Sequence, residues 1–228
     1  DDLFEVELSG YKTLRARSVV IATGARYRRL NLPNLERYEK AGIFYAATEL
    51  EARRCRGAET VVVGAGNSAG QAAMYMAQTA HQVHLLCRGP DLRRSMSQYL
   101  VTRLERTPNV TIHLRTEVRA LHGEDGLRAV TIANGHGNER QLPASAMFVM
   151  VGADPCTSWL QGAVLLDDKG FVLTGADLDG RCSAPLASPF ETSEPGIFAV
   201  GDVRSGSVKR VASAVGEGSV VVQAVHRY

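Results

Sequence analysis

The chain has 228 residues, enough for one large domain or two small ones. Its hydrophobic fraction of 45%, charged fraction of 22% and net charge of +2 are ordinary for a soluble globular protein. The near-neutral charge gives no sign of a nucleic-acid partner, and no apolar run reaches the roughly 18 residues that a membrane-spanning helix needs. We therefore expect no nucleic acid and no membrane as partner.

The cysteines are scattered and form no C-x-x-C pair, and no signal-peptide pattern opens the chain. We expect reduced thiols in a cytoplasmic protein, each a small structural side chain. The four are Cys55, Cys87, Cys156 and Cys182. The chain begins without Met inside a strand-like pattern, so we expect a further N-terminal portion before Asp1.

Apolar periodicity and turn residues predict the elements of the N-terminal part in order. They are a hairpin (3–8 and 11–16), a buried parallel strand (18–22), an irregular connection (26–40), a short strand (42–45) and a helix (48–54). Thr48 is expected to cap this helix, with Glu51 completing a capping box.

A strand, a glycine-rich turn, an amphipathic run and a second strand then follow one another between Thr60 and Arg88. This order predicts the βαβ unit that binds a dinucleotide, with a helix over 71–79. Gly64 makes the sharp turn, Gly66 lets a pyrophosphate approach the backbone, and the small Ala69 lets the helix pack closely. The free N–H groups at the start of the helix then face the phosphates. The simpler alternative is a glycine turn in another kind of α/β protein.

The remaining elements are predicted in the same way. They are a helix (97–106), a parallel strand (110–113), a β-meander (117–121, 129–133 and 140–142), a buried strand (146–151), loops (176–189), a buried strand (196–200) and a helix (209–228). The last helix is rich in Ala and Gly, so we expect it to pack closely against another element.

The end of the second strand of the βαβ unit decides between NAD and NADP. Arg88 and Arg93 lie there, with Arg94 adjacent, and Asp91 is a few residues beyond the tip. Charged hydrogen bonds of roughly 1.5–3 kcal/mol each could favour NADPH over NADH by a factor on the order of 100. The alternative is a solvated basic loop.

A second signal is the dipeptide Gly201-Asp202, directly after a buried strand. A carboxylate at the carboxyl end of a parallel strand can accept a hydrogen bond from a ribose or ribityl hydroxyl. An aspartate that only caps the next turn is the alternative.

Five motifs occur together in one order: 21–24, 64–70, Arg88 with Arg93, 151–155 and 196–202. With them the whole chain resembles the low-molecular-weight thioredoxin reductase family of flavin disulfide oxidoreductases. The resemblance implies an α/β fold in which a Rossmann-like NAD(P)-binding domain, with parallel sheet and β-meander, is inserted in a partial FAD-binding Rossmann-like domain. The domains would be 1–40 and 161–228 for FAD and 41–160 for NAD(P)H, in a homodimer.

The resemblance also implies the cofactors FAD and NADPH and a set of residues for each. The FAD residues would be Thr23, Gly24, Asp202, Arg210, Val211 and Ala212. The NADPH residues would be Gly64, Gly66, Asn67, Ser68 and Ala69 on the pyrophosphate, and Arg88 and Arg93 on the 2′-phosphate. Gly152 and Gly201 belong to the cofactor-binding motifs as well.

The chain departs from the family pattern in three places. The FAD-binding βαβ unit that opens family members is absent, and the second arginine of the arginine motif is Gly89. The redox-active Tyr-Cys-Ala-Thr-Cys is replaced by Tyr45-Ala-Ala-Thr-Glu49, so Ala46 and Glu49 stand where the cysteines should be. The stretch 205–218 is similar to a subgroup that lacks the dithiol and is often fused to a cyclic-nucleotide-binding or response-regulator domain.

Three functions remain open from the sequence. The first is an NADPH-dependent FAD oxidoreductase that passes a hydride from nicotinamide to flavin N5, with no catalytic protein residue, no metal and an unknown small-molecule or protein acceptor. The second is a genuine thioredoxin-disulfide reductase with a dithiol outside this chain. The third is a nucleotide or redox sensor fused to a regulatory domain.

Overall fold

The computed structural model describes residues 3–10, 12–39, 41–160, 162–181 and 188–228. The chain divides into two compact units, one built from 1–26 with 153–228 and the other from 27–152. We call them the end unit and the middle unit. The sequence suggested borders after residues 40 and 160, whereas the compact units change at 26/27 and 152/153. Assigning each unit to a cofactor stays a prediction.

The middle unit is built on five parallel strands in the order β5-β12-β6-β7-β8. Their bounds are β5 (Ile43–Phe44), β12 (Ala146–Val149), β6 (Glu59–Val63), β7 (Gln82–Cys87) and β8 (Val110–Leu114). From β6 the chain adds β7 and β8 on one side, and β12 later pairs with the other side of β6. The order therefore reverses at β6, and ligands of such sheets bind outside the carboxyl end of the strand at this switch point.

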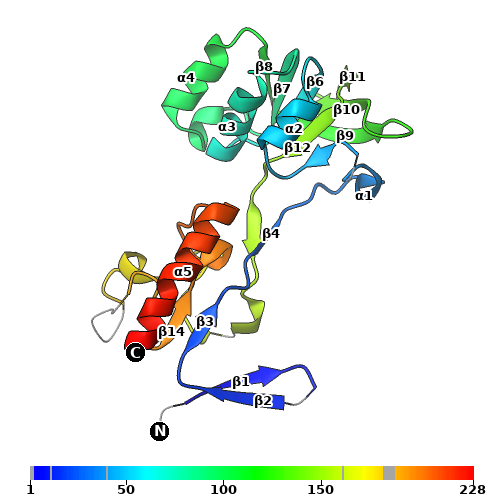
Figure 1. Cartoon of the computed structure of the whole chain (residues 1–228). Coiled ribbons are helices and arrows are strands. Elements are labelled where there is room, and N and C mark those ends of the chain that lie inside the picture. The colour runs from blue at the N-terminus through cyan, green and yellow to red at the C-terminus, as the bar shows by residue number, and fades with distance from the viewer. Residues whose placement is uncertain (1–2, 11, 40, 161, 182–187) are drawn as a thin grey trace. The chain divides into compact units, whose positions relative to one another are not determined.

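Each face of this sheet is covered by a different layer (Figure 1). One carries α2 (Glu49–Arg54), α3 (Asn67–Met76) and α4 (Gln98–Arg106). The other carries the antiparallel meander β9 (Thr116–His122), β10 (Ala129–Asn134) and β11 (Glu139–Pro143), together with α1 (Leu35–Tyr38). Neighbouring strand residues alternate between the layers: Val62 packs with the helices and Val61 with the meander. The parallel sheet and the meander are confirmed.

The helix after the glycine turn begins earlier than the sequence indicated. We expected it over 71–79, whereas α3 runs from Asn67 to Met76. Gly66 is extended (φ −89°, ψ 177°) and caps the helix, so the small residues that follow it form its first turn. The N-terminus of α3 therefore lies directly at the glycine turn.

The stretch 26–40, expected to be irregular, contains the end of β4 (Ala25–Tyr27) and the short helix α1. Leu35 and Tyr38 are buried on α1, but a single turn is too short to show a helical period. The expected capping box of α2 is confirmed, because the Thr48 side chain accepts the Glu51 N–H and the Glu51 carboxylate accepts the Thr48 N–H at 3.0 Å.

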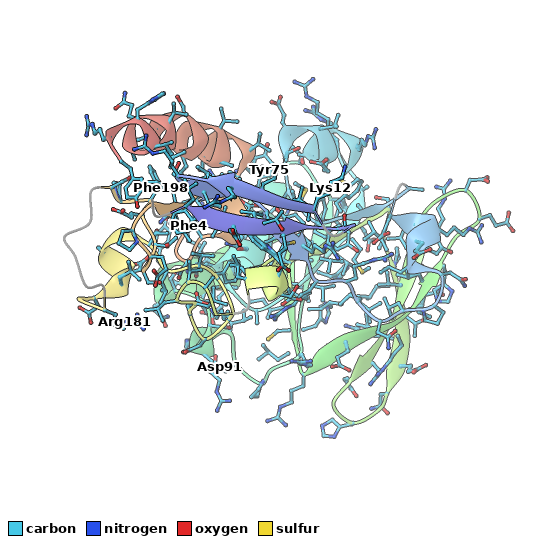
Figure 2. The ribbon with its side chains drawn as sticks, turned by 90° about the horizontal axis from the view of Figure 1, so that it is seen from below. Phe4, Lys12, Tyr75, Asp91, Arg181 and Phe198 are labelled. Atoms are coloured by element: carbon cyan, nitrogen blue, oxygen red, sulfur yellow. The ribbon has the colours of Figure 1, made fainter. Side chains whose placement is uncertain are left out.

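Among the described residues, the end unit contains short strand pairs and one long helix, and the last residue of β4, Tyr27, is already the first of the middle unit. The strands are β1 (Phe4–Leu8) with β2 (Lys12–Ala16), β3 (Val19–Ile21) with β14 (Ile197–Ala199), and β4 with β13 (Ala153–Pro155). Short 3₁₀ turns are η1 (Leu92–Arg94) in the middle unit and η2 (Ser158–Leu160), η3 (Gly175–Leu178) and η4 (Gly201–Val203) here. Figure 2 labels Phe4 and Lys12 on the antiparallel hairpin, and β3 and β14 are parallel as predicted. The predicted loops over 176–189 include η3, and residues 182–187, with Cys182, lie outside the described residues.

The long helix α5 (Val211–Arg227) packs over β14 less closely than its small residues suggested. Val221 and Ala224 are buried beside Phe198, which Figure 2 labels on β14. Gly216 and Gly218, by contrast, face open space. Within the described residues, close packing of α5 is therefore seen at Val221 and Ala224 and not at these two glycines. Among the described residues, no helix combines the length and apolarity needed to cross a bilayer.

A chain of side-chain hydrogen bonds joins β8 and β7 of the sheet to β11 of the meander. Arg140 donates to His113 Nδ1 at 3.0 Å, and His113 Nε2 lies 3.0 Å from His84 Nδ1. Because Nδ1 of His113 accepts, its Nε2 carries the proton and donates to His84, whose Nε2 then faces Glu59 at 3.4 Å. Both imidazoles are therefore neutral. Burial lowers the pKa of both rings, that of His113 to about 4.

We predict that the stability of this protein falls as the pH drops from 6.5 towards 4. The unfolded chain takes up a proton on His113 near pH 6.5, whereas the folded chain resists it until about pH 4, so acid favours unfolding over this window. Thermal unfolding followed across this pH range by circular dichroism measures the slope. The variant His113→Gln should flatten it, and the exposed control His136→Gln should not. An unchanged slope in His113→Gln would contradict the prediction.

Candidate functional site

The glycine turn at the end of β6 is held by a backbone contact that only glycine allows. Gly64 has φ +149°, and a Cβ added there would lie 2.4 Å from the Met150 carbonyl oxygen and 2.9 Å from Ala69 Cβ. Ala69 itself is fully buried. Gly64 and Ala69 thus let α3 start close against the ends of β6 and β12.

The space around Gly66 is open, because the nearest atom to a Cβ added there is the Ser95 carbonyl oxygen at 3.9 Å. Asn67 and Ser68, the first residues of α3, are exposed. The first N–H groups of a helix have no intrahelical partner, and this end carries partial positive charge. A phosphate group of a dinucleotide fits this open turn.

The side chain of Asn67 is already engaged in holding the next loop. Its Oδ1 accepts the Ser97 N–H at 2.8 Å, and the Ser95 hydroxyl donates to the Ala65 carbonyl at 2.9 Å. Met96 packs against Gly70, where an added Cβ would lie 2.8 Å from its sulfur. The loop after β7 is thereby tied to the glycine turn, and the Oδ1 of Asn67 is occupied by the Ser97 N–H, which leaves the backbone N–H of Asn67 and its Nδ2 group as donors for a ligand. Sequence reasoning missed these contacts, because they join segments about thirty residues apart.

The two arginines predicted for the 2′-phosphate lie in different surroundings. Arg93 donates to Glu105 at 2.7 Å and lies 3.7 Å from the carboxylate of Asp91, which Figure 2 labels. Asp91 caps η1 by accepting the Arg93 N–H at 3.0 Å. Arg88 is exposed and lines a pocket of about 630 Å³ in which Arg115 and other residues take part. Only Arg88 of the pair is therefore directed to an open basic pocket.

The end unit brings the predicted FAD residues of two strands to one sheet edge. β3 and β14 are parallel neighbours, so the chain that follows each of them, at Thr23 and at Gly201, emerges on the same side. Gly24 has φ +69° and faces open space, and the Thr23 hydroxyl donates to the Cys156 carbonyl at 2.8 Å. In the part of the chain that the structure describes, the half-buried Asp202 carboxylate has no hydrogen-bond partner. A ligand hydroxyl fits this acceptor, beside which the Lys209 ammonium donates to the Asp202 backbone carbonyl at 3.2 Å.

A buried ion pair fixes the Gly201-Asp202 turn. Glu217 on α5 accepts the Gly201 N–H at 2.6 Å and pairs with Arg204 at 2.8 Å, with side chains only 14% and 18% exposed. Burial alone would raise the pKa of Glu217, but the hydrogen bonds from Arg204 and Gly201 bring it below its ordinary value. Sequence reasoning missed this pair, although a lone carboxylate within an apolar helix was the available signal.

The other predicted cofactor residues are accessible. Arg210, Val211 and Ala212 at the start of α5 are exposed, Val211 by 83%. Gly152 is also exposed, with φ +99°, and its carbonyl accepts the Arg28 N–H at 3.0 Å. That these residues bind a cofactor stays a prediction.

The described cysteines are not placed for disulfide chemistry. Cys55 and Cys87 are buried, and Cys156 is half-buried. Burial raises the pKa of Cys55 to about 11, so this thiol stays protonated and weakly reactive at neutral pH. At the expected dithiol positions, Ala46 is exposed and Glu49 pairs with Arg53 at 2.5 Å on α2.

Comparison with known proteins also indicates a nucleotide-binding oxidoreductase family. The family profile described as pyridine nucleotide-disulphide oxidoreductase matches residues 3–218. The chain is 28% identical to an NADH dehydrogenase of Bacillus subtilis and 32% identical to the NADPH-dependent thioredoxin reductase 3 of Arabidopsis thaliana. These matches cover 100% and 99% of this chain but only 42% and 41% of the relatives, so the chain spans about two fifths of their length.

A thioredoxin reductase of known structure from Streptococcus pyogenes shares the architecture. Its TM-score is 0.78 at 30% identity, over 97% of this chain and 68% of that chain. The mixed α/β fold with a parallel sheet, predicted from the sequence, is thereby confirmed.

We predict that alanine at one glycine of the turn lowers the stability of the protein, whereas alanine at the other weakens dinucleotide binding. Gly64→Ala should destabilise the protein by about 2 kcal/mol or more, because its Cβ would overlap the Met150 carbonyl oxygen at a strained φ. Gly66→Ala should change stability by less than about 1 kcal/mol and weaken dinucleotide binding about tenfold, because its Cβ enters the open turn. Thermal unfolding and calorimetric titration with NADPH measure the two effects. Equal effects of both variants on stability would contradict the prediction.

Proposed function

Because this chain belongs to the pyridine nucleotide-disulphide oxidoreductase family, we propose that it is part of an FAD- and NADPH-dependent oxidoreductase of thioredoxin-reductase type. One observation carries the proposal: the turn at the carboxyl end of β6 is packed shut at Gly64 and open at Gly66. This is the arrangement that a dinucleotide pyrophosphate requires at a topological switch point. When bound, the two cofactors would supply hydride transfer from nicotinamide to flavin.

The residues of this chain then bind and orient the cofactors. The N–H groups at the start of α3 hold the pyrophosphate, and Arg88 attracts the additional negative charge that distinguishes NADPH from NADH. Asp202, held in place by the Glu217–Arg204 pair, accepts from a hydroxyl of the FAD ribityl chain. No side chain of this chain is needed as an acid or base.

We propose that electrons leave the flavin without a dithiol supplied by this chain. Ala46 and Glu49 occupy the positions at which low-molecular-weight thioredoxin reductases carry their redox-active cysteines. The nearby Cys55 is buried and protonated. The acceptor is a small molecule or a protein that reaches the flavin directly. Cytoplasmic location and a homodimer remain parts of this proposal.

A second candidate is thioredoxin reduction through a dithiol outside this chain. The 32% identity to the thioredoxin reductase of Arabidopsis thaliana over 99% of this chain favours it. A thioredoxin-coupled assay with NADPH separates the two functions. Thioredoxin reduction at a rate matching flavin reduction would favour the second candidate, and its absence would favour the first.

We predict that NADPH bleaches the visible flavin absorbance of the full-length, FAD-loaded protein under anaerobic conditions. The reason is that both nucleotide sites would be occupied by the cofactors that exchange the hydride. Stopped-flow absorbance records the reaction. Failure of both NADPH and NADH to bleach the flavin would rule out the proposed function.

We further predict that Asp202→Ala lowers FAD affinity by about tenfold or more, because one charged hydrogen bond is lost. The measurement is the FAD content and FAD dissociation constant of the purified full-length protein. Asp168→Ala, which removes an exposed carboxylate, is the matched control. If both variants retain FAD equally, Asp202 does not bind it.

A further inference from the structure

The pocket beside Arg88 contains a second arginine that lies outside the family motif. β7 and β8 are parallel and in register up to the pair Cys87 and Leu114. Arg88 and Arg115 are the next residue on each strand, so both leave the sheet at the same edge. Both line the pocket of about 630 Å³.

Arg115 also lies against the position where the arginine motif is interrupted. Its backbone N–H donates to the Gly89 carbonyl at 3.0 Å. Gly89 is the residue that replaces the second consecutive arginine of the motif. The side chain of Arg115 therefore leaves the backbone beside Gly89, the position at which the family motif has its second arginine.

The backbone of Arg115 is strained, with φ +51° in the left-handed region that favours glycine or asparagine. This conformation costs a non-glycine residue on the order of 1 kcal/mol. The hairpin between β10 and β11 packs behind it, since a Cβ added at Gly135 would lie 3.3 Å from Arg115 Cβ. The arginine side chain of residue 115 is thus carried by a backbone position better suited to glycine.

The charges around the pocket leave two guanidinium groups uncompensated. Arg119 is paired with Glu117 at 3.3 Å, and Arg93 is paired with Glu105. Within the described ranges, neither Arg88 nor Arg115 forms an ion pair. A phosphate monoester carries between one and two negative charges near neutral pH, and planar guanidinium groups bind it through paired hydrogen bonds.

We propose that Arg115 and Arg88 together bind the 2′-phosphate of NADPH, and that Arg115 replaces the arginine lost at Gly89. Arg93 then serves to hold the loop against α4 through Glu105 and does not contact the phosphate. This inference rests on the proposed function, because it assumes that the pyrophosphate of the same nucleotide lies at Gly66. It names the residues that set the preference for NADPH.

Binding of NADPH and NADH, measured by calorimetric titration without turnover, tests the inference. Arg115→Gln should raise the dissociation constant for NADPH by roughly 10- to 100-fold, as expected for one lost charged contact, and change that for NADH by less than about twofold. The matched control Arg103→Gln removes an exposed arginine of α4 outside the pocket and should change neither. The probe 2′,5′-ADP should follow NADPH in every variant.

The variant Arg115→Gly tests whether a loss of NADPH binding is caused by a loss of folding. Glycine relieves the left-handed backbone, so the melting temperature should equal or exceed that of the parent while the preference for NADPH is lost. The inference is overturned if Arg115→Gln leaves the ratio of the two dissociation constants unchanged, or if Arg93→Gln alone abolishes it. If the parent protein binds neither nucleotide, the proposed function itself fails.

Discussion

The candidate site depends on the close backbone approach between Gly64 and the Met150 carbonyl, whose oxygen would lie 2.4 Å from a Cβ added at Gly64. This approach brings the turn after β6 against the chain leaving β12, so that the two strands on either side of the switch point end together. Ala69 fills the remaining space, and α3 can begin within a few residues of the strand. A larger residue at Gly64 would push the helix away, and the open space above Gly66 would no longer face a helix N-terminus.

Much of this architecture could be predicted because it depends on local patterns. The buried runs of β6, β7 and β12, the alternation in the meander and the capping box at Thr48 are each visible within a few residues. The start of α3 was misplaced because Asn67 and Ser68 are typical of turns as well as of first helical turns. Local sequence does not separate these two uses.

What could not be predicted is which side chains are already bound to the protein. Asn67 and Arg93 match the family motif, yet one side chain holds Ser97 and the other Glu105. Arg115 carries no motif, yet it shares the pocket of Arg88 because β7 and β8 are neighbours. Such pairings depend on strand order and register, which the spacing of residues does not reveal.

The bond between the Ser95 hydroxyl and the Ala65 carbonyl has a consequence for coenzyme engineering. This bond and the one between Asn67 and Ser97 hold the glycine turn and the loop after β7 in a fixed position relative to each other. Because these bonds fix the loop relative to the phosphate turn, a redesign that replaces the loop has to keep them. Transferring residues 88–97 as one segment would preserve both hydrogen bonds, the one from the Ser95 hydroxyl and the one from the Ser97 N–H.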